Sequence, residues 1–215
     1  MNKLILWFVK ITGFIPELLV FRRKTLYENK KNQSRRIKGR ALIVSNHTSV
    51  FDVASAMFLF PFRDLYFITA ELMFQKNKLF SWFLKRIGAI KVNRNVYDFK
   101  FVDESVKFLN KNKVVLVYPE SRLPLKDEER PLPFKPSTVL IALKTHAPII
   151  PIYTDGNYFN SKRNNVIIGE KIYLDTYYDN NKSEKENVIE LNNLLRNKII
   201  DLGNILNERK QKEKK

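Results

Sequence analysis

Short apolar runs alternate with longer segments of helical periodicity along most of this 215-residue chain, and no other feature restricts its fold as much. The apolar runs predict strands at 41–45, 65–69, 88–92, 114–118, 148–153 and 166–173, and the periodic segments predict helices at 48–60, 72–86, 97–111, 136–145 and 184–209. Helices between consecutive strands favour a parallel sheet with the helices on its faces. The sequence therefore predicts an α/β fold with a mostly parallel, mixed sheet flanked by helices.

An apolar stretch at 4–21 and a basic linker at 22–40 precede this region. Lys3, Lys10 and Glu17 recur at every seventh position, so they share one narrow polar stripe of a helix. Charged residues and a proline interrupt the stretch, which makes it a poor transmembrane span, and no signal-peptide cleavage site follows it. The proline is expected to kink this N-terminal helix or to split it in two.

The other side of this helix is wide and apolar. It carries Leu4, Trp7, Phe8, Ile11, Ile15 and Leu18, and Arg22-Arg23-Lys24 follows directly. An apolar face next to a basic block is typical of an amphipathic helix that lies in a membrane interface. The alternative is a helix packed on its own domain.

The formal net charge is +17, and more than half of the excess lies in residues 1–40, which hold eleven Lys or Arg residues against Glu17 and Glu28. Such a segment is attracted to a polyanion, either nucleic acid or an anionic membrane surface. The excess lies beside an apolar helix and not on an aromatic-studded sheet, so the sequence favours anionic lipids and no nucleic-acid partner. A non-enzymatic nucleic-acid-binding protein is the alternative from a different class.

Cysteine is absent and histidine occurs twice. The chain therefore has no disulfide, no thiol nucleophile and no cysteine-ligated zinc. Because no carboxylate cluster surrounds the histidines, no metal site is expected.

The segment NHTSVFD at 46–52 directly follows the first expected buried strand. A histidine held by a carboxylate acts as a general base toward a hydroxyl or a water. Five helical residues turn through about 140°, so His47 and Asp52 meet only if His47 lies at the turn that enters a helix and Asp52 lies in its first turns. The expected strand-to-helix junction supplies this geometry. A solvated or helix-capping residue is the simpler interpretation of an isolated pair.

Two clusters of polar and charged side chains follow other expected strands. Arg94 comes after one strand, and Glu120, Ser121 and Arg122 come after the next. Ligands of open α/β sheets bind beyond the carboxyl ends of the strands, and a guanidinium binds phosphate through two N–H groups. The sequence thus places candidate phosphate-binding groups at the same edge as His47. A surface salt bridge is the alternative for either arginine.

These segments together resemble the glycerolipid acyltransferases of the 1-acylglycerol-3-phosphate acyltransferase type, a family marked by four sequence blocks. All four are matched in order over roughly residues 41–156. They are NHxSxxD, matched at 46–52; a Gly-x-Ile-x-Val-x-Arg-like strand, matched by Gly88, Ile90, Val92 and Arg94; a Phe-Pro-Glu-Gly-Thr-Arg-like block, matched in part by Tyr118-Pro119-Glu120-Ser121-Arg122; and a Val-Pro-Ile-like strand, matched by Ile150-Pro151-Ile152.

The third block departs from the family pattern. Ser121 stands where the family has glycine, and the family threonine is missing or replaced. With a one-residue deletion Arg122 takes the place of the family's phosphate-binding arginine; without a gap Leu123 does. We favour the deletion, because Arg122 keeps the charge beside Glu120. The acidic, proline-rich loop at 123–135 is expected to narrow or reshape the acceptor site.

The resemblance implies acyl transfer from acyl-CoA or acyl carrier protein, as co-substrate, to the free hydroxyl of a lysophospholipid. No acyl-enzyme, metal or other cofactor is implied. His47 would take the hydroxyl proton, and Asp52 would fix the imidazole tautomer and stabilise its charged form. Backbone N–H groups at 47–49 are expected to stabilise the oxyanion.

The same resemblance implies the substrate-binding residues. Arg94 and Arg122 would hold the acceptor phosphate, with Glu120 ordering that pocket. Lys91 and Ser121 are further candidates for substrate binding.

The expected organisation is a membrane-associating segment at 1–40, an acyltransferase catalytic domain at 41–183, and a C-terminal helix with a basic tail at 184–215. The enzyme is expected to act in phospholipid biosynthesis at the cytoplasmic face of a membrane, as a peripheral or monotopic protein. The altered third block supports an alternative, a tailoring acyltransferase of the same superfamily that acts on another lipid or natural-product hydroxyl. An inactive scaffold is a weaker alternative, because His47 and Asp52 are intact.

Overall fold

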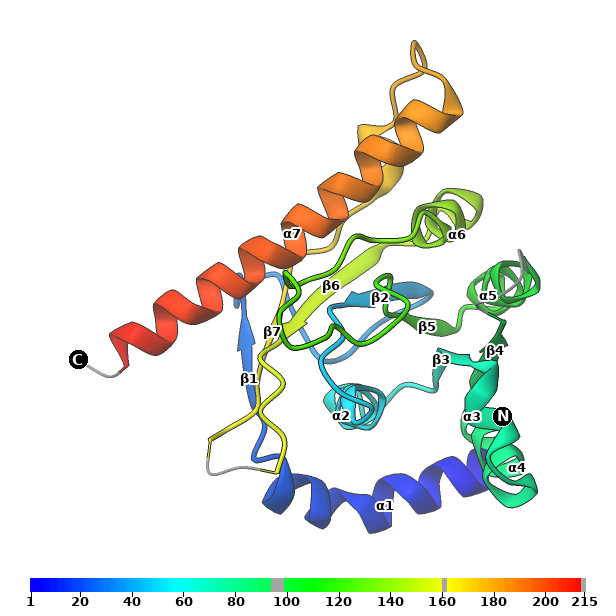
Figure 1. Ribbon diagram of the computed structural model, residues 1–215, viewed down its shortest axis with the longest axis vertical. Helices are drawn as coiled ribbons and strands as arrows, with labels where there is room; N and C mark the ends of the chain where they lie inside the picture. The colour runs from blue at the N-terminus through cyan, green and yellow to red at the C-terminus, as the bar shows by residue number, and fades with distance from the viewer. Residues whose placement is uncertain (94–98, 160–161, 214–215) are drawn as a thin grey trace.

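A seven-stranded sheet lies at the centre of the protein (Figure 1). The structure, a computed structural model, describes residues 1–93, 99–159 and 162–213. The strands are β1 (Lys24–Tyr27), β2 (Ala41–Ser45), β3 (Leu65–Ala70), β4 (Ala89–Val92), β5 (Val114–Val117), β6 (Ile149–Thr154) and β7 (Asn165–Ile168). Their order is β1-β7-β6-β2-β5-β3-β4, and neighbouring strands are parallel except β6 and β7, which are antiparallel. The predicted α/β fold with a mostly parallel, mixed sheet is confirmed.

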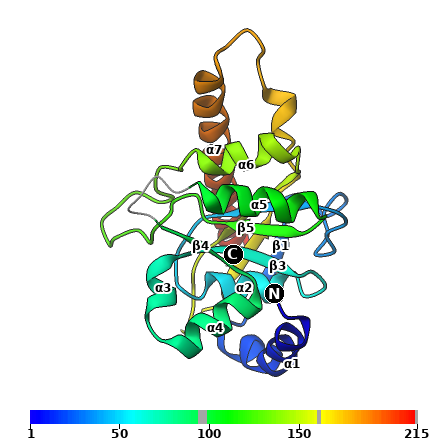
Figure 2. The same ribbon diagram turned by 90° about the vertical axis from the view of Figure 1, so that its right-hand side faces the viewer.

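Helices cover both faces of this sheet. The described helices are α1 (Lys3–Val20), α2 (Asp52–Leu59), α3 (Glu71–Gln75), α4 (Lys78–Ile87), α5 (Lys100–Asn110), α6 (Ser137–Thr145), the short 3-10 helix η1 (Leu174–Tyr177) and α7 (Glu184–Lys212). One layer contains α5, α6 and α7, and the other contains α1, α2 and α4 (Figures 1 and 2).

The side chains of β2 alternate between the two layers. Leu42 and Val44 pack in the core with α5, α6 and α7, whereas Ala41 and Ile43 pack in the core with α1, α2 and α4. Successive strand residues point to opposite faces, and both faces of this sheet are covered by helices. The central strands therefore consist almost entirely of apolar residues.

The structure differs from the sequence expectations in two segments. The segment 22–40, expected to be a linker, contains β1, which pairs with β7 at the edge of the sheet. The single helix expected at 72–86 is two helices, α3 and α4. Asn77 separates them, because its side chain accepts a hydrogen bond from the N–H of Phe80 at 2.6 Å and so begins α4.

Two residues of the polar stripe of α1, Lys10 and Glu17, face the body of the protein, whereas Lys3 is exposed. Lys10 donates hydrogen bonds to the carbonyl oxygens of Pro61 and Arg63, each at 2.8 Å, and Glu17 forms an ion pair with Arg23. Lys10 is only 8% exposed and Glu17 only 3%. A buried charge requires such partners, so these contacts orient the helix about its axis.

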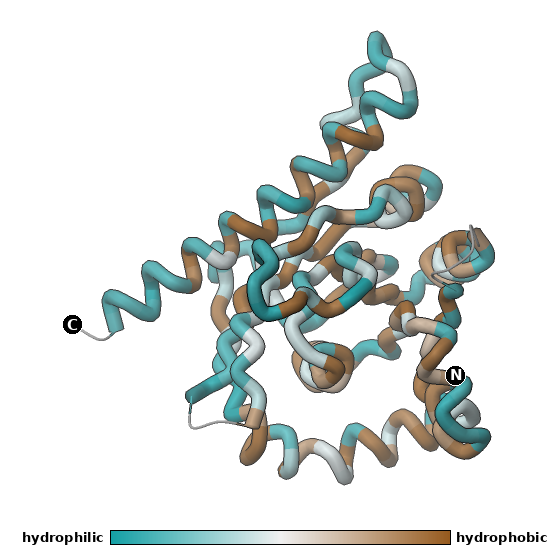
Figure 3. The backbone as a smooth tube through the Cα atoms, in the orientation of Figure 1, coloured by the Kyte–Doolittle hydropathy of each residue, from teal (hydrophilic) through white to brown (hydrophobic). Residues whose placement is uncertain are grey.

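The opposite side of α1 points away from the protein and is apolar. Its exposed side chains are Leu4, Trp7, Phe8, Ile11, Phe14, Ile15, Leu18 and Leu19. Figure 3 shows the hydrophobic colour along α1 at the lower edge of the molecule. The helix thus packs on its own domain, as the alternative has it, through Leu6, Lys10 and Glu17, while this wide apolar side stays exposed. The helix is continuous through Pro16, so the expected split does not occur. Within the described ranges, no helix combines the length and hydrophobicity of a membrane-spanning segment.

The packing of α7 on the sheet gives a test of this core. Ile199 of α7 is fully buried and Ile189 of the same helix is exposed. Ile199→Ala is expected to lower the free energy of unfolding by about 2–5 kcal/mol, because it leaves a cavity between α7 and the sheet. Ile189→Ala should change it by less than about 0.5 kcal/mol. Urea denaturation of both variants measures the difference, and equal effects would contradict this packing.

Candidate active site

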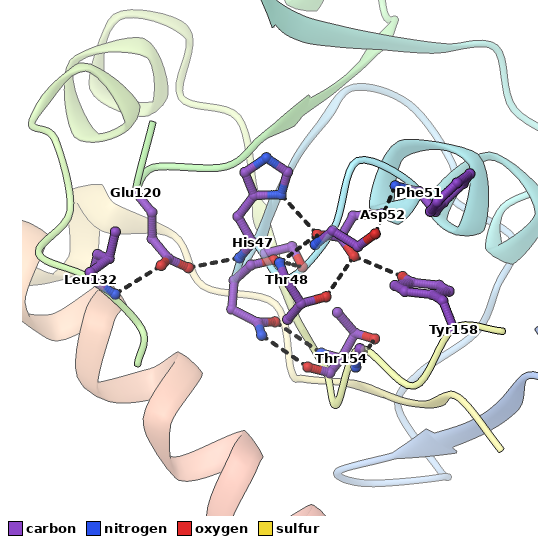
Figure 4. A network of polar contacts seen from close by, with 12 residues as sticks. His47, Thr48, Phe51, Asp52, Glu120, Leu132, Thr154 and Tyr158 are labelled. Carbon is purple, nitrogen blue, oxygen red and sulfur yellow. Dashed lines mark hydrogen bonds and ion pairs between the residues drawn. The ribbon is translucent and has the colours of Figure 1, made fainter. Parts of the chain in front are cut away.

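The catalytic candidates lie where β2 leads into α2. The strand ends at Ser45, the loop 46–51 carries His47, and α2 begins at Asp52. His47 Nδ1 lies 2.8 Å from Asp52 Oδ2 (Figure 4). The helix begins later than the sequence predicts, at 52 and not at 48, but the turn-to-helix geometry expected for the pair is present.

The Asp52 carboxylate is buried and accepts four further hydrogen bonds. Oδ2 accepts from the backbone N–H groups of Thr48 (2.6 Å) and Ser49 (2.9 Å). Oδ1 accepts from the Thr48 hydroxyl and from the Tyr158 hydroxyl, each at 2.8 Å. Hydrogen bonds of this kind favour the charged form of a carboxylate. The site therefore holds an anion directly behind the imidazole.

The imidazole of His47 is oriented from two sides. Asp52 accepts a hydrogen bond from the N–H at Nδ1, which leaves Nε2 as the nitrogen that can take a proton. The ring stacks on Tyr118, with ring centroids 4.5 Å apart and an interplanar angle of 21°. The His47 side chain is 14% exposed, so a substrate can reach it. This arrangement suits a general base.

Glu120 holds the backbone around the site. Its Oε1 accepts from the N–H of His47 at 2.7 Å and its Oε2 from the N–H of Leu132 at 2.8 Å. Burial raises the pKa of Glu120, and these two backbone N–H groups oppose the rise. Glu120 thus ties the loop that carries His47 to the segment after the third block.

The expected oxyanion donors are already in use. The N–H of His47 is donated to Glu120, and those of Thr48 and Ser49 are donated to Asp52. A backbone N–H that is committed to a buried carboxylate is not available to an oxyanion. The expectation that residues 47–49 supply the oxyanion site is therefore wrong.

Asn46 fixes the end of β2 to the end of β6. Its side-chain amide donates to the carbonyl oxygen of Thr154 and accepts from the N–H of Thr154, both at 2.9 Å. The first position of the NHTSVFD segment therefore joins two strands at the carboxyl edge of the sheet and holds the loop that carries His47.

The third block forms a tight turn. Ser121 has a φ of +60°, in the left-handed region that glycine occupies without strain, which agrees with its place at the family glycine. The Arg122 guanidinium binds both carboxylate oxygens of Glu128, at 2.6 and 2.5 Å, and its hydrogen bonds hold the pKa of Glu128 at about 2. The Arg122 side chain is 49% exposed, so it faces the surface of the acidic loop.

One further substrate-binding candidate, Lys91, lies farther along the sheet. Lys91 is on β4, which β5 and β3 separate from β2, and its ammonium lies 2.8 Å from Glu71. Arg94 lies outside the described residues. The structure thus brings together His47, Asp52 and Glu120, and it places Lys91 apart from them. Among the described residues, no cluster of three or more histidine or carboxylate side chains is arranged to hold a metal ion.

A comparison with known protein families gives a match over more than half of the chain. The sequence profile of the family described as Acyltransferase matches residues 24–155, which include β1, the NHTSVFD segment and the third block. The chain belongs to the acyltransferase family. It is therefore an enzyme, an O-acyltransferase.

Two relatives show how far the likeness of this acyltransferase extends. The 1-acyl-sn-glycerol-3-phosphate acyltransferase of Bacillus subtilis (strain 168) is 25% identical over 173 residues, which cover 78% of this chain and 83% of that protein. The crystal structure of the 1-acyl-sn-glycerophosphate (LPA) acyltransferase PlsC from Thermotoga maritima superposes with a TM-score of 0.63 at 18% identity. That match covers 92% of this chain and 79% of the other.

Sequence reasoning missed two aromatic residues of the candidate site. Tyr118 directly follows β5 and lies in the third block, where an aromatic residue is part of the pattern, so the sequence did contain an indication of its place. Tyr158 lies four residues beyond β6, in a loop that matches no block. Its place beyond the carboxyl end of a strand was the sole indication.

Removal of Glu120 is expected to loosen the site. Glu120→Ala leaves two backbone N–H groups, those of His47 and Leu132, without their partner, which costs about 1–3 kcal/mol for each buried group. Both the free energy of unfolding and the rate of acyl transfer should fall, because the loop that carries His47 loses its anchor. Glu104→Ala, at an exposed position of α5, is the matched control and should change neither.

The same variant gives a pH test. Burial raises the pKa of Glu120 above 4.5, so the folded protein binds a proton at this carboxylate more readily than the unfolded chain does. The contribution of Glu120 to stability is therefore present at low pH and falls as the pH rises from 4.5 through the raised pKa. The difference in unfolding free energy between wild type and Glu120→Ala should therefore widen as the pH is lowered toward 4.5. A difference that narrows would show that Glu120 is held mainly as an ion.

Proposed function

We propose that this acyltransferase moves a fatty acyl group from an acyl thioester to the free hydroxyl of a lysophospholipid such as 1-acylglycerol-3-phosphate, in phospholipid biosynthesis. The observation that carries the proposal is the pair of His47 and Asp52, with Nε2 of the imidazole directed away from the carboxylate and reachable. The substrate named for the Bacillus subtilis relative supports a lysophosphatidic acceptor.

The chemistry needs one base and no covalent enzyme intermediate. Nε2 of His47 takes the proton of the acceptor hydroxyl as its oxygen forms a bond to the thioester carbonyl carbon. The carbon–sulfur bond then breaks, and the leaving thiolate takes the proton back from the imidazolium. Asp52 holds the tautomer and stabilises the imidazolium during the transfer. The products are an ester and a free thiol.

The donor is proposed to be acyl-CoA or acyl carrier protein, bound as a co-substrate. Both carry anionic groups, in CoA as phosphates and in a carrier protein as an acidic surface. A chain with a formal net charge of +17 attracts either. A comparison of the two donors at equal acyl-chain length distinguishes them.

Arg122 is proposed to bind the acceptor phosphate, together with Arg94. In the structure its guanidinium holds the Glu128 carboxylate bidentately, which is the geometry with which arginine also binds phosphate. A phosphorylated acceptor would have to replace Glu128. This occupied arginine also favours the second candidate, an acyltransferase of the same superfamily whose acceptor lacks the phosphate.

We propose further that α1 docks on an anionic membrane surface and that the enzyme is peripheral, at the cytoplasmic face. Lys10 and Glu17 of the polar stripe are used for contacts inside the protein, and the apolar side faces outward, where a lipid surface would bury it. Lys3 and Arg22 are exposed near the two ends of the helix, where cations favour anionic lipids.

His47→Ala is expected to lower acyl transfer by about 10²–10⁴-fold without loss of the fold, because a general base contributes about that much. The chain offers a matched control in His146, whose Nδ1 also lies 3.0 Å from a carboxylate, that of Asp175, but whose side chain is 70% exposed. His146→Ala should keep full activity. The assay uses labelled acyl-CoA or acyl carrier protein and lysolipids with and without a phosphate, scored by product mass.

A folded His47→Ala variant with wild-type turnover would overturn the proposed mechanism. Transfer to acceptors without a phosphate, at rates above those with one, would replace the lysophosphatidic acceptor by the second candidate. Arg122→Ala then distinguishes the two kinds of acceptor further, because it should raise the acceptor KM only for phosphorylated acceptors.

The membrane proposal has its own test. The double change Phe8→Ser and Ile11→Ser removes two exposed apolar side chains of α1 and is expected to weaken binding to anionic phosphatidylglycerol vesicles by about tenfold or more. Ile189→Ser, which alters an exposed apolar residue of α7, is the matched control. Binding of the wild type should weaken with salt but persist, because the apolar contact is not screened. Full co-sedimentation of the double variant would contradict the docking face.

A further inference from the structure

Tyr158 touches the catalytic carboxylate without belonging to any sequence block. It lies in the loop after β6, and its hydroxyl donates a hydrogen bond to Asp52 Oδ1 at 2.8 Å. Figure 4 shows Tyr158 and His47 on opposite sides of Asp52. The carboxylate is therefore held from behind by Tyr158 while its other oxygen holds the imidazole.

The ring of Tyr158 rests on the residue that ends α1. Phe21 is the C-cap of α1, and its ring meets that of Tyr158 edge to face, with centroids 5.0 Å apart. Phe21 is buried, and its carbonyl oxygen accepts the N–H of Asn164, which precedes β7. Phe51, the residue before Asp52, packs on the same rings. One aromatic cluster thus joins the end of α1 to the catalytic acid.

We propose that Tyr158 is a positioning residue of the active site, and that Phe21 seats it so that the packing of α1 is transmitted to the Asp52 carboxylate. The inference rests on the general-base role proposed for His47. It adds a residue that acts through Asp52, and it gives α1 a second role besides contact with a surface.

The charged and titratable groups around the pair are few. Burial raises the pKa of both phenols, Tyr118 and Tyr158, so each keeps its proton at working pH. Glu120 faces the pair from the third block, and Arg23, which interacts electrostatically with Tyr158, faces it from the segment after α1. Tyr158 is therefore a constant donor to Asp52 over the pH range of an activity assay.

Loss of the Tyr158 hydroxyl should move the pH–rate profile in one definite direction. With one hydrogen bond fewer, the charge of the Asp52 carboxylate is less dispersed and attracts the imidazolium form of His47 more strongly. The base is then protonated at a higher pH, so the acid limb of the pH–rate profile should move up. The carboxylate is also less restrained, so the turnover number should fall while the substrate KM values stay the same.

The test is the pH–rate profile of full-length Tyr158→Phe with acyl-CoA and a soluble, short-chain lysophosphatidic acceptor. We expect kcat to fall about tenfold, the size of one hydrogen bond to a charged group, with unchanged KM and an acid limb shifted to higher pH. Tyr153→Phe is the matched control, since Tyr153 lies on β6 and makes no hydrogen bond with Asp52 among the described residues. It should leave the profile unchanged.

Phe21→Leu tests the link to α1, because it keeps an apolar side chain but removes the ring beneath Tyr158. A smaller shift of the acid limb in the same direction is expected. The Phe8→Ser, Ile11→Ser double variant should weaken vesicle binding and leave the profile with soluble substrates unchanged.

The outcomes separate this inference from the proposed function. A wild-type profile for Tyr158→Phe, or a change confined to KM, overturns the positioning role while inactive His47→Ala still supports the general base. An unshifted profile for Phe21→Leu overturns the link to α1. An active His47→Ala variant overturns the proposed mechanism and this inference with it.

Discussion

Burial of a single carboxylate determines the shape of the candidate active site. An ionised Asp52 would be costly to bury without partners, and five donors surround it: an imidazole, two backbone N–H groups and two hydroxyls. These donors come from the loop after β2 and from the loop after β6. Both loops must fold against one another before the charge is satisfied, so the same contacts that stabilise the anion also set the direction of the His47 ring. They also use the N–H groups of Thr48 and Ser49, so stabilisation of the oxyanion falls to other donors.

The short helix α2 links this carboxylate to the unusual orientation of α1. Asp52 lies in its first turn, where a negative charge meets the positive end of the helix dipole. At its other end, Arg23 and Arg35 donate to the last carbonyl oxygens of the helix, and Lys10 donates to the two carbonyls just beyond it. The N-terminal segment thus supplies the cations that the carboxyl end of α2 requires. This requirement explains why Lys10 and Glu17 of α1, and not its apolar side, face the protein.

Much of this architecture was predictable because it depends on local patterns. Apolar runs marked the central strands, and the spacing of His47 and Asp52 at a strand-to-helix junction predicted their contact. The edge strand β1 was missed because KTLY contains two polar residues of four and pairs only with a distant segment. Tyr158 was missed for the same reason, since its role depends on a contact across 106 positions of the chain. The commitment of Thr48 and Ser49 to Asp52 follows from the local fold of a loop, which the residue types alone do not specify.

The pairing of β1 also has a consequence for the order of events during synthesis. Lys24 pairs with Asn165, so the strand that follows α1 has no partner until nearly all of the sheet has been made. Contacts between such distant segments form late, and the sheet edge closes last. During translation α1 therefore emerges with its apolar side uncovered while the catalytic loops are still incomplete. The surface contact proposed for α1 is thus available to the nascent segment, before the loops around His47 and Asp52 are complete.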